Sequence, residues 1–516
     1  MKRIKSLYEL AIYPLKVLYI AFVIMGIGNI ILSDNFAIFY TITNTYILLI
    51  AKFLTLAGIF LIKIFPLILI LGLINRKNLK GQALIISLVG YISFLISTMV
   101  FSDTNLNLSY YITDMGISYT TFDALTNVQT YHYPLQTGLF GSLIVLFCSQ
   151  LAYLKSRGRT NYGFFAFLKK DDYGVILNIL FCFISGFFVS LLFPYFADLT
   201  TYLVSFISLD ITNPINLFVY GILDRFSAVI YVPESIKQSF WFGSNGGTMA
   251  TITGARITGD IALFEQTVEQ AIINSKAGRF ISPYFVLNIF AIPGYIIALQ
   301  TIQTDRLQRT RTIFFATFAI IVSIMTASLL PVELFMLFLS PLILGFHILY
   351  TGLLFAICEF LNIHMGYIYY GDIVSSSPGS FIDIVIYFRN HLFSQSINYI
   401  IIIGFISMLI YFLVTRIYFK YLAFDILNTG RKKKVVEGLL IAIGGIDNIK
   451  STSSSISRLI VQVEDPTKLN LSHLQRLGAT KVMRTRAGLA MSFGASSLMI
   501  KMLVDGKINE NKREIK

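Results

Sequence analysis

Charged residues are scarce in this sequence, and their scarcity excludes an ordinary soluble protein. Asp, Glu, Lys and Arg make up 13% of the 516 residues, about half of the roughly 25% found in soluble domains. Hydrophobic residues make up 55%. Several apolar runs approach the ~20 residues that a helix needs to cross a bilayer; they cover residues 10–32, 83–101, 175–196, 312–330 and 397–414. We therefore expect a polytopic α-helical membrane protein with about ten transmembrane or re-entrant helices.

Cysteine and tryptophan are also rare. The three cysteines, Cys148, Cys182 and Cys358, lie in apolar segments, and none follows Cys358. No pair has the spacing of a metal site or a redox motif. We assign them to packing as small hydrophobic side chains, and we expect no metal and no other cofactor. One Trp stands against 29 Tyr, so tyrosines are expected to supply most of the interfacial aromatic contacts.

Basic residues are missing between Lys80 and Lys155, where the only formal charges are Asp103, Asp114 and Asp123. The formal net charge is +14, and the basic residues cluster in short loops at residues 2–5, 76–80, 155–170, 306–311 and 431–434. Basic loops stay on the cytoplasmic side of a membrane. We therefore expect a multi-pass protein of the bacterial plasma membrane, with both termini cytoplasmic and an uncleaved first helix. Its basic residues are expected to meet the lipid bilayer and not nucleic acid.

The composition changes after residue 425. Residues 426–436 are interpreted as a basic linker, 437–506 as a small α/β domain on the cytoplasmic side, and 507–516 as a charged, frayed tail. Local patterns predict a helix at 435–443, a strand at 456–463 and a helix at 471–477. Within the membrane part, the Gly- and Thr-rich stretch 244–259 is either part of a substrate path or an external loop, because polar backbone at membrane depth must be buried in protein or line a cavity.

Short motifs follow one another in a fixed order along the chain. Those of the membrane part are Thr-Gly-Leu-Phe-Gly at 137–141, Ala-Gly-Arg-Phe at 277–280, Phe-Ala-Ile-Pro-Gly at 290–294, Ile-His-Met-Gly at 363–366 and Phe-Ile-Asp at 381–383. Those of the last domain are Gly-Gly-Ile-Asp at 444–447 and Ser-Ile-Ser-Arg-Leu at 455–459. Each motif is weak alone. Their common order over nearly the whole chain resembles the glucose superfamily of phosphotransferase system (PTS) sugar permeases.

The resemblance implies that residues 1–425 form a IIC-like permease domain, which binds an extracellular sugar, and that 437–506 form a IIB-like domain. In that family a phosphocysteine of the IIB domain phosphorylates the sugar as it arrives inside. The implied partners are a sugar and a IIA-type phosphocarrier or a separate IIB protein. Family members pair through the IIC domain, which implies a homodimer.

The phosphocysteine position is changed in this chain. Family members carry Asp-Ala-Cys-Ile-Thr-Arg-Leu, and the match here is Ser-Ser-Ser-Ile-Ser-Arg-Leu at 453–459, with Ser455 at the cysteine position. A thiol readily becomes a nucleophilic thiolate, whereas a serine hydroxyl is a poor nucleophile without a base. We therefore expect Ser455, the candidate catalytic residue, to be inactive. The alternatives are an unusual phosphoserine and an inert serine-rich loop.

The sugar site departs from the family as well. The family's Gly-Ile-Thr-Glu-Pro motif matches residues 327–331, where the glutamate that binds sugar hydroxyls has become Leu330. A second acidic position, Glu333, is retained. The segment 230–242, where family members carry paired histidines, holds Glu234 and no histidine.

The remaining candidates for substrate binding are Glu333, His347, Arg279 and Glu234, while Gln136 replaces an acidic residue upstream. Ionisable residues are costly to bury in a membrane, so their presence suggests function. The rival interpretation of Glu333 and His347 is a hydrogen bond between helices. For Arg279 it is a helix cap or the channel entrance.

Two functions remain open after these changes. The first is a IIC–IIB permease for sugar uptake or sensing that still phosphorylates its sugar. The second is a catalytically dead paralogue that acts as a membrane receptor, a regulator or a passive facilitator; the changes at Ser455 and Leu330 together favour it. An unrelated ion transporter would require a relay of charged residues through the helices, and the sequence shows none.

Overall fold

A computed structural model describes most of the chain, and the described residues are mainly helical. They are residues 2–32, 41–75, 81–102, 117–123, 128–156, 170–232, 234–250, 256–270, 277–303, 306–327, 329–367, 378–388, 390–422, 432–479, 481–485 and 488–514. Eight helical segments among them are long and apolar enough to cross a membrane: Leu10–Leu32, Thr45–Lys63, Gln82–Phe101, Gly138–Ser156, Asp172–Ser208, Ser282–Ile302, Pro341–Phe360 and His391–Tyr421. The prediction of a polytopic helical body is confirmed.

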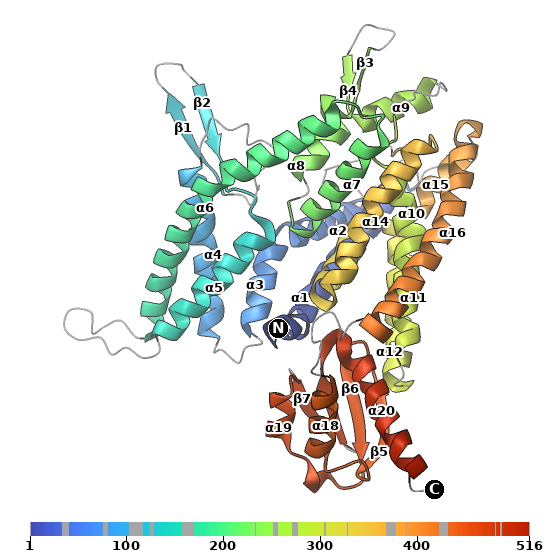
Figure 1. The fold of residues 1–516 in the computed structure, drawn as a ribbon. Coiled ribbons are helices and arrows are strands. Elements are labelled where there is room, and N and C mark those ends of the chain that lie inside the picture. The colour runs from blue at the N-terminus through green and yellow to red at the C-terminus, as the bar shows by residue number, and fades with distance from the viewer. Residues whose placement is uncertain are drawn as a thin grey trace, which may run out of the picture.

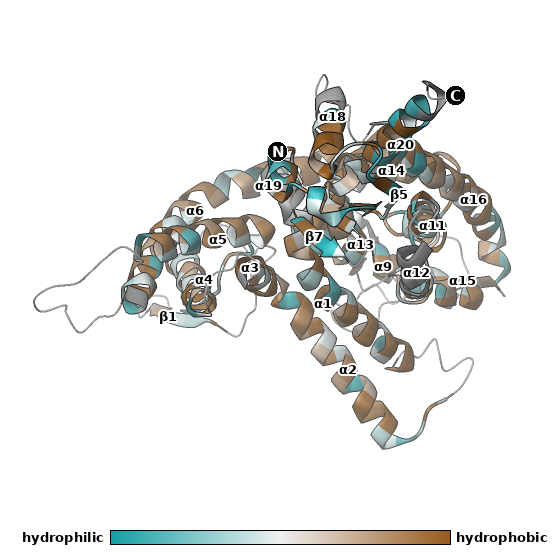
Figure 2. Ribbon diagram, turned by 90° about the horizontal axis from the view of Figure 1, so that it is seen from below, coloured by the Kyte–Doolittle hydropathy of each residue, from teal (hydrophilic) through white to brown (hydrophobic). Residues whose placement is uncertain are grey.

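Six helices are described in the first half of the membrane part, blue to teal in Figure 1. They are α1 (Lys2–Leu32), α2 (Thr45–Lys63), α3 (Phe65–Asn75), α4 (Gln82–Phe101), α5 (Gly138–Ser156) and α6 (Lys170–Ser208). The antiparallel strands β1 (Tyr119–Asp123) and β2 (Val128–His132) form a hairpin between α4 and α5. Helix α1 packs along α2, and α4 packs along α5 and α6. Most of the residues in these helices are hydrophobic (Figure 2).

A buried amide joins α4, α5 and α6. Asn178 of α6 donates from Nδ2 to the Ile86 carbonyl of α4 at 2.7 Å and to Ser149 Oγ of α5 at 3.0 Å. Helices in lipid associate through such polar contacts and through small residues that allow close approach. Gly90 of α4 is one of these, because a Cβ there would lie 2.1 Å from Asn178 Nδ2.

The second half of the membrane part mixes long helices with short and irregular ones. The helices are α7 (Pro214–Val229), α8 (Glu234–Lys237), α9 (Asp260–Gln270), α10 (Ser282–Val286), α11 (Ile292–Ile302), α12 (Arg306–Thr326), α13 (Leu330–Leu339), α14 (Pro341–Phe360), α15 (Phe381–Phe388) and α16 (Ser394–Ile417). Shorter π-helical segments are η4 (Gln238–Phe242), η6 (Leu287–Ala291) and η9 (Tyr418–Leu422), and short 3₁₀ helices are η5 (Ser244–Gly246) and η8 (His391–Phe393). The hairpin β3 (Thr248–Ala250) and β4 (Arg256–Thr258) falls in the polar stretch 244–259, at the end of the helices opposite both termini (Figure 1).

The predicted span 312–330 is interrupted. Helix α12 ends at Thr326, and α13 begins at Leu330. Ala327 has a φ of +50°, in the left-handed region that non-glycine residues rarely adopt, so it cannot continue a right-handed helix. Pro331 then lies in the first turn of α13, where its missing N–H is tolerated. The break sets Glu333 in the first turn of a new helix.

Helices α7 and α14 pack closely through two glycines. A Cβ on Gly221 of α7 would lie 2.8 Å from the Cα of Gly352 in α14 and 2.5 Å from the Phe355 ring. Backbone atoms cannot move aside as the end of a flexible side chain can. The short distance between the two helices therefore depends on this pair of glycines. The contact fixes how residues of α7 face residues of α14.

Gly221→Ala is expected to destabilise the protein by about 1–3 kcal/mol, because the added methyl group forces α7 away from α14. The thermal unfolding midpoint of purified protein in detergent checks this. Gly345→Ala is the matched control, since it lies on the same α14 helix and its Cβ would meet nothing within 4 Å. The control should raise the midpoint, because alanine favours a helix over glycine by roughly 0.5–1 kcal/mol. Equal midpoints for both variants would contradict the packing role of Gly221.

The last domain contains one four-stranded antiparallel sheet with the strand order β5-β6-β8-β7. Its strands are β5 (Ile449–Ser454), β6 (Arg458–Val463), β7 (Lys481–Thr485) and β8 (Gly488–Ser492), and its helices are α18 (Lys432–Ile443), α19 (Leu471–Arg476) and α20 (Ser497–Glu514), with the short turns η10 (Pro466–Lys468) and η11 (Gly494–Ser496). The domain has its own hydrophobic core. Hydrophilic residues are more frequent here than in the membrane helices (Figure 2).

Both edges of this domain differ from the sequence prediction. Helix α18 begins at Lys432, inside the predicted linker 426–436, and Val436 is buried in the core of the domain. Helix α20 runs to Glu514, through most of the segment expected to be frayed. Val504, in the middle of α20, is fully buried against the same core. Ile508, inside the charged segment, packs on the same core, and this packing on one face supports the helix there.

Candidate functional site

A group of buried polar side chains lies where α7, α10, α13, α14 and α16 meet. We call it the Arg225 cluster; its members are Asp224, Arg225, Tyr284, Glu333, His347 and Tyr411. Every member is at most 3% exposed. Two of the predicted substrate residues, Glu333 and His347, lie within it.

Arg225 is the hub of the cluster. Its Nε donates to Asp224 Oδ2 at 2.8 Å, its Nη1 to Glu333 Oε1 at 3.1 Å, and its Nη2 to the Tyr284 hydroxyl at 2.7 Å. Tyr284 in turn donates to Asp224 Oδ2 at 2.6 Å. A buried guanidinium needs such partners to offset its lost hydration.

His347 extends the cluster to a fourth helix and a fifth. Its Nε2 lies 3.1 Å from Glu333 Oε1, and its Nδ1 lies 2.7 Å from the Tyr411 hydroxyl. Both ring nitrogens are therefore engaged. Tyr411 comes from α16, so one imidazole links α13, α14 and α16.

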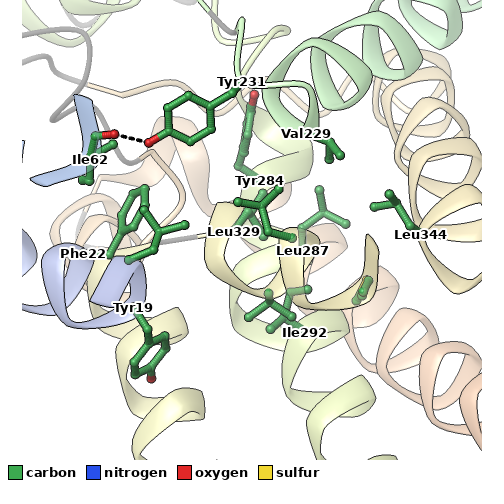
Figure 3. Packing of buried hydrophobic residues seen from close by; sticks show 14 of the residues in the cluster. Tyr19, Phe22, Ile62, Val229, Tyr231, Tyr284, Leu287, Ile292, Leu329 and Leu344 are labelled. Carbon is green, nitrogen blue, oxygen red and sulfur yellow. Dashed lines mark hydrogen bonds between the residues drawn. The ribbon is translucent and has the colours of Figure 1, made fainter. Parts of the chain in front are cut away.

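The local sequence explains why these side chains converge. Asn213 caps the start of α7 by accepting from Ile215 N at 2.9 Å, and Pro214 occupies the first turn. The adjacent residues Asp224 and Arg225 then fall three turns into a helix that would otherwise be apolar on this face. In Figure 3 the Tyr284 hydroxyl points away from Leu287 and Ile292, which pack beneath it.

Two carboxylate oxygens in the cluster are buried without a hydrogen-bond partner among the described residues. They are Asp224 Oδ1 and Glu333 Oε2. A buried acceptor left unpaired costs about 1–3 kcal/mol. Hydroxyl groups of a ligand can remove that penalty by donating to these oxygens. The cluster therefore has the acceptors that a polyhydroxylated molecule would need.

Leu330 lies one helical turn before Glu333 in α13. Residues three apart share a helix face, so Leu330 is on the same side as Glu333. Its side chain is partly buried against the apolar core. The leucine side chain therefore provides no hydrogen-bond acceptor on the helix face that carries Glu333.

Arg279 belongs to a second buried cluster. Its Nη1 donates to Glu359 Oε1 at 2.9 Å and also to the Ile211 carbonyl. Glu359 Oε2 lies 3.4 Å from His364 Nε2. Nearby, Asp260 Oδ1 accepts from Gly278 N at 2.8 Å. These contacts tie the loop before α10 to the end of α14, away from Glu333 and His347.

The other two positions singled out in the sequence do not reach the Arg225 cluster by any contact that the described residues show. Glu234 begins the short helix α8, and its side chain lies outside the described residues. Gln136 precedes Gly138, which abuts residues 230–231: Leu139 N donates to the Ile230 carbonyl at 2.9 Å. The Oε1 of Gln136 is buried without a partner among the described residues. Tyr231, next to this contact, donates to the Ile62 carbonyl (Figure 3).

Sequence reasoning gave no role to Arg225, Tyr284 and Tyr411. The adjacent pair Asp224-Arg225 within an apolar helix was the available signal, since intramembrane charges are rare and usually paired. The two tyrosines carried no such signal, because the chain has 29 of them.

Ser455 lies in the tight turn between β5 and β6, where its N–H donates to the Arg458 carbonyl at 2.8 Å. The side chain is half-buried. The next residue, Ile456, packs on the hydrophobic core of the membrane helices together with Ala495 and Leu498. Helix α20 also contacts η9, at the end of α16. The turn that carries Ser455 thus faces the membrane helices (Figure 1).

Comparison with known proteins finds similarity along nearly the whole chain. No family model matches it. The chain resembles a PTS permease. It is 26% identical over 524 residues to the "PTS system glucose-specific EIICBA component" of Staphylococcus saprophyticus, and the match covers 96% of this chain and 72% of the relative. The match spans the membrane helices and the last domain together. With the eight membrane-length helices among the described residues, it supports a multi-pass membrane protein of the PTS sugar-transport type.

Proposed function

We propose that this protein is a sugar permease-like membrane protein of the IIC–IIB type, working in sugar uptake or sensing, whose own phosphotransfer step has been lost. The observation that carries the proposal is the similarity to a glucose-specific PTS component over 96% of the chain. Ser455 at the phosphocysteine position argues against phosphotransfer, because no other cysteine follows Cys358.

The Arg225 cluster is proposed as the sugar site. Asp224 Oδ1 and Glu333 Oε2 are buried acceptors without partners among the described residues, and sugar hydroxyls are suitable donors. Arg225 and His347 hold the two carboxylates in place. Glucose is the first sugar to test, because the relative is described as glucose-specific.

The domain organisation and topology follow the same proposal. Residues 1–425 are the IIC-like domain, 432–514 the IIB-like domain, and both termini lie on the cytoplasmic side of the plasma membrane. The two ends of the chain lie at the same end of the helices, which supports this topology (Figure 1). A IIA-type carrier or a separate IIB protein, and a second copy of the chain, are proposed partners.

A second candidate is a receptor or regulator that binds sugar without moving it. The docking of Ile456, Ala495 and Leu498 on the membrane core favours it. A change at the sugar site could reach the last domain through this contact. The two candidates differ in whether sugar crosses the membrane.

Uptake of radiolabelled glucose into proteoliposomes that contain the full chain separates the candidates. A facilitator should equilibrate glucose across the membrane without phosphoenolpyruvate and without phosphorylating it. Glu333→Gln should slow uptake at least about tenfold, because it weakens a charge-assisted hydrogen bond of ~1.5–3 kcal/mol. Glu269→Gln, at an exposed end of α9, is the control and should leave uptake unchanged. Sugar phosphate inside the vesicles would refute the loss of phosphotransfer, and binding without uptake would favour the receptor.

A further inference from the structure

The Arg225 cluster is closed in this structure, and the closure sets a condition for any ligand. All of its members are at most 3% exposed. Protein interiors are packed about as densely as organic crystals, so a sugar ring fits here only if the surrounding helices move. They must separate before the buried oxygens Asp224 Oδ1 and Glu333 Oε2 can accept hydrogen bonds from sugar hydroxyls.

The hydrogen bonds of His347 indicate which helices hold the cluster closed. Its Nε2 lies 3.1 Å from Glu333 Oε1, and its Nδ1 lies 2.7 Å from the Tyr411 hydroxyl. Glu333 belongs to α13 and Tyr411 to α16. The imidazole thus connects these two helices, and moving α16 away from α13 must break a hydrogen bond on one side of the ring.

The last domain is connected to both of these helices. Helix α20 contacts η9, which continues α16 directly from Tyr418, about two helical turns after Tyr411. The short helix η11 contacts α1, and α1 packs along α13. The domain therefore bridges the α16 side and the α13 side of the membrane part, at the end of the helices where both termini lie (Figure 1).

The bridging contact is apolar and separate from the domain's own core. Ile456, Ala495 and Leu498 pack on the hydrophobic core of the membrane helices, which also includes the buried Phe419 of η9. The sheet and helices of the domain enclose a different cluster of buried side chains. Because the two cores are separate, the domain can leave the membrane helices without unfolding.

We propose that the last domain is a releasable lock on the membrane helices. When docked, it holds α13 and α16 in the closed arrangement, and its release lets the Arg225 cluster open to a sugar. This inference rests on the proposed sugar site. Docking favours the closed arrangement and sugar favours the open one, so each weakens the other reciprocally, and sugar affinity falls with the fraction of molecules that are locked. Such a lock needs no nucleophile, which is compatible with Ser455 in the docked turn.

The first experiment measures amide hydrogen exchange of the full chain in detergent without sugar. Ile456→Asp puts a charge into the apolar contact, and we expect exchange in η9 and α13 to be at least about threefold faster, while β6 and β8 stay protected because the domain remains folded. Ile441→Asp, at a 73% exposed isoleucine of the same domain, is the matched control and should change nothing. Leu498→Ser is a second variant should Ile456→Asp fail to fold. Unchanged exchange in η9 and α13 of both variants would overturn the lock.

The second experiment measures the coupling to sugar. Ile456→Asp in proteoliposomes should take up glucose at least about threefold faster than the wild type, and Ile441→Asp should match the wild type. Glucose added to the wild type should in turn speed hydrogen exchange in η9. Uptake by Ile456→Asp that is equal to or slower than that of an active wild type would overturn the coupling. If no variant binds glucose while the sugar-free exchange still responds to Ile456→Asp, glucose as the proposed ligand fails and the lock stands.

Discussion

Arg225→Met is expected to lower the free energy of unfolding by about 3–5 kcal/mol, the usual penalty for removing one partner of a buried ion pair. The substitution keeps an unbranched side chain of similar length but leaves Asp224 and Glu333 without their shared cation. The expected result is a large fall of the thermal midpoint in detergent, together with loss of monodisperse protein on size-exclusion chromatography.

A rescue variant makes this prediction specific. Arg225→Met combined with Glu333→Gln and Asp224→Asn removes the uncompensated charge, and we expect it to recover much of the lost stability. Arg416→Met, at an exposed position near the end of α16, is the control and should change the midpoint little. If Arg225→Met were as stable as Arg416→Met, Arg225 would not stabilise the fold by compensating the charges of Asp224 and Glu333.

Ser455→Cys is expected to create a phosphorylatable domain where the wild-type chain has none. A cysteine at this turn regains a group that ionises readily, and thiolates attack phosphoryl donors far better than an unassisted serine hydroxyl does. Incubation with phosphoenolpyruvate, the general PTS carriers and a IIA protein should label the variant close to stoichiometrically and the wild type only at background.

The matched control for this gain of function is Ser451→Cys. Ser451 lies on β5, where its hydroxyl donates to Gln462 Oε1 at 3.0 Å, and it is exposed but outside the turn. Label on both cysteine variants would indicate unspecific modification. Label on wild-type Ser455 would contradict the proposed loss of the nucleophile. Phosphorylation of sugar is expected only when Leu330→Glu is added, because the site otherwise lacks the carboxylate at that position.

The apolar runs singled out in the sequence predicted four of the eight membrane-length helices among the described residues. The runs 10–32 and 83–101 correspond closely to the spans Leu10–Leu32 and Gln82–Phe101. The run 312–330 was misleading, because hydrophobicity continues across Ala327 while the backbone there has a positive φ. Composition alone does not reveal such a break; the nearest signal is Pro331, which favours the first turn of a new helix.

The Arg225 cluster was only half predictable. Glu333 and His347 stood out as charges in apolar segments. Their main partner could not be assigned, since Arg225 is 108 residues from Glu333 in sequence and contacts of that range depend on how the helices pack. The two interpretations of Glu333, a substrate residue and a hydrogen bond between helices, do not exclude each other. Glu333 bonds to its neighbours through Oε1 and still leaves Oε2 without a partner among the described residues.

The docked turn at Ser455 also affects encounters with other proteins. Because α20 and the turn are tethered to the helices they contact, that contact re-forms at an effective local concentration on the order of millimolar. A carrier protein approaching this turn from solution would have to compete with that contact. In the Ser455→Cys variant, the carrier could phosphorylate the cysteine only while Ile456 is released from the membrane core. The rate of labelling would therefore measure the fraction of time that this contact is open.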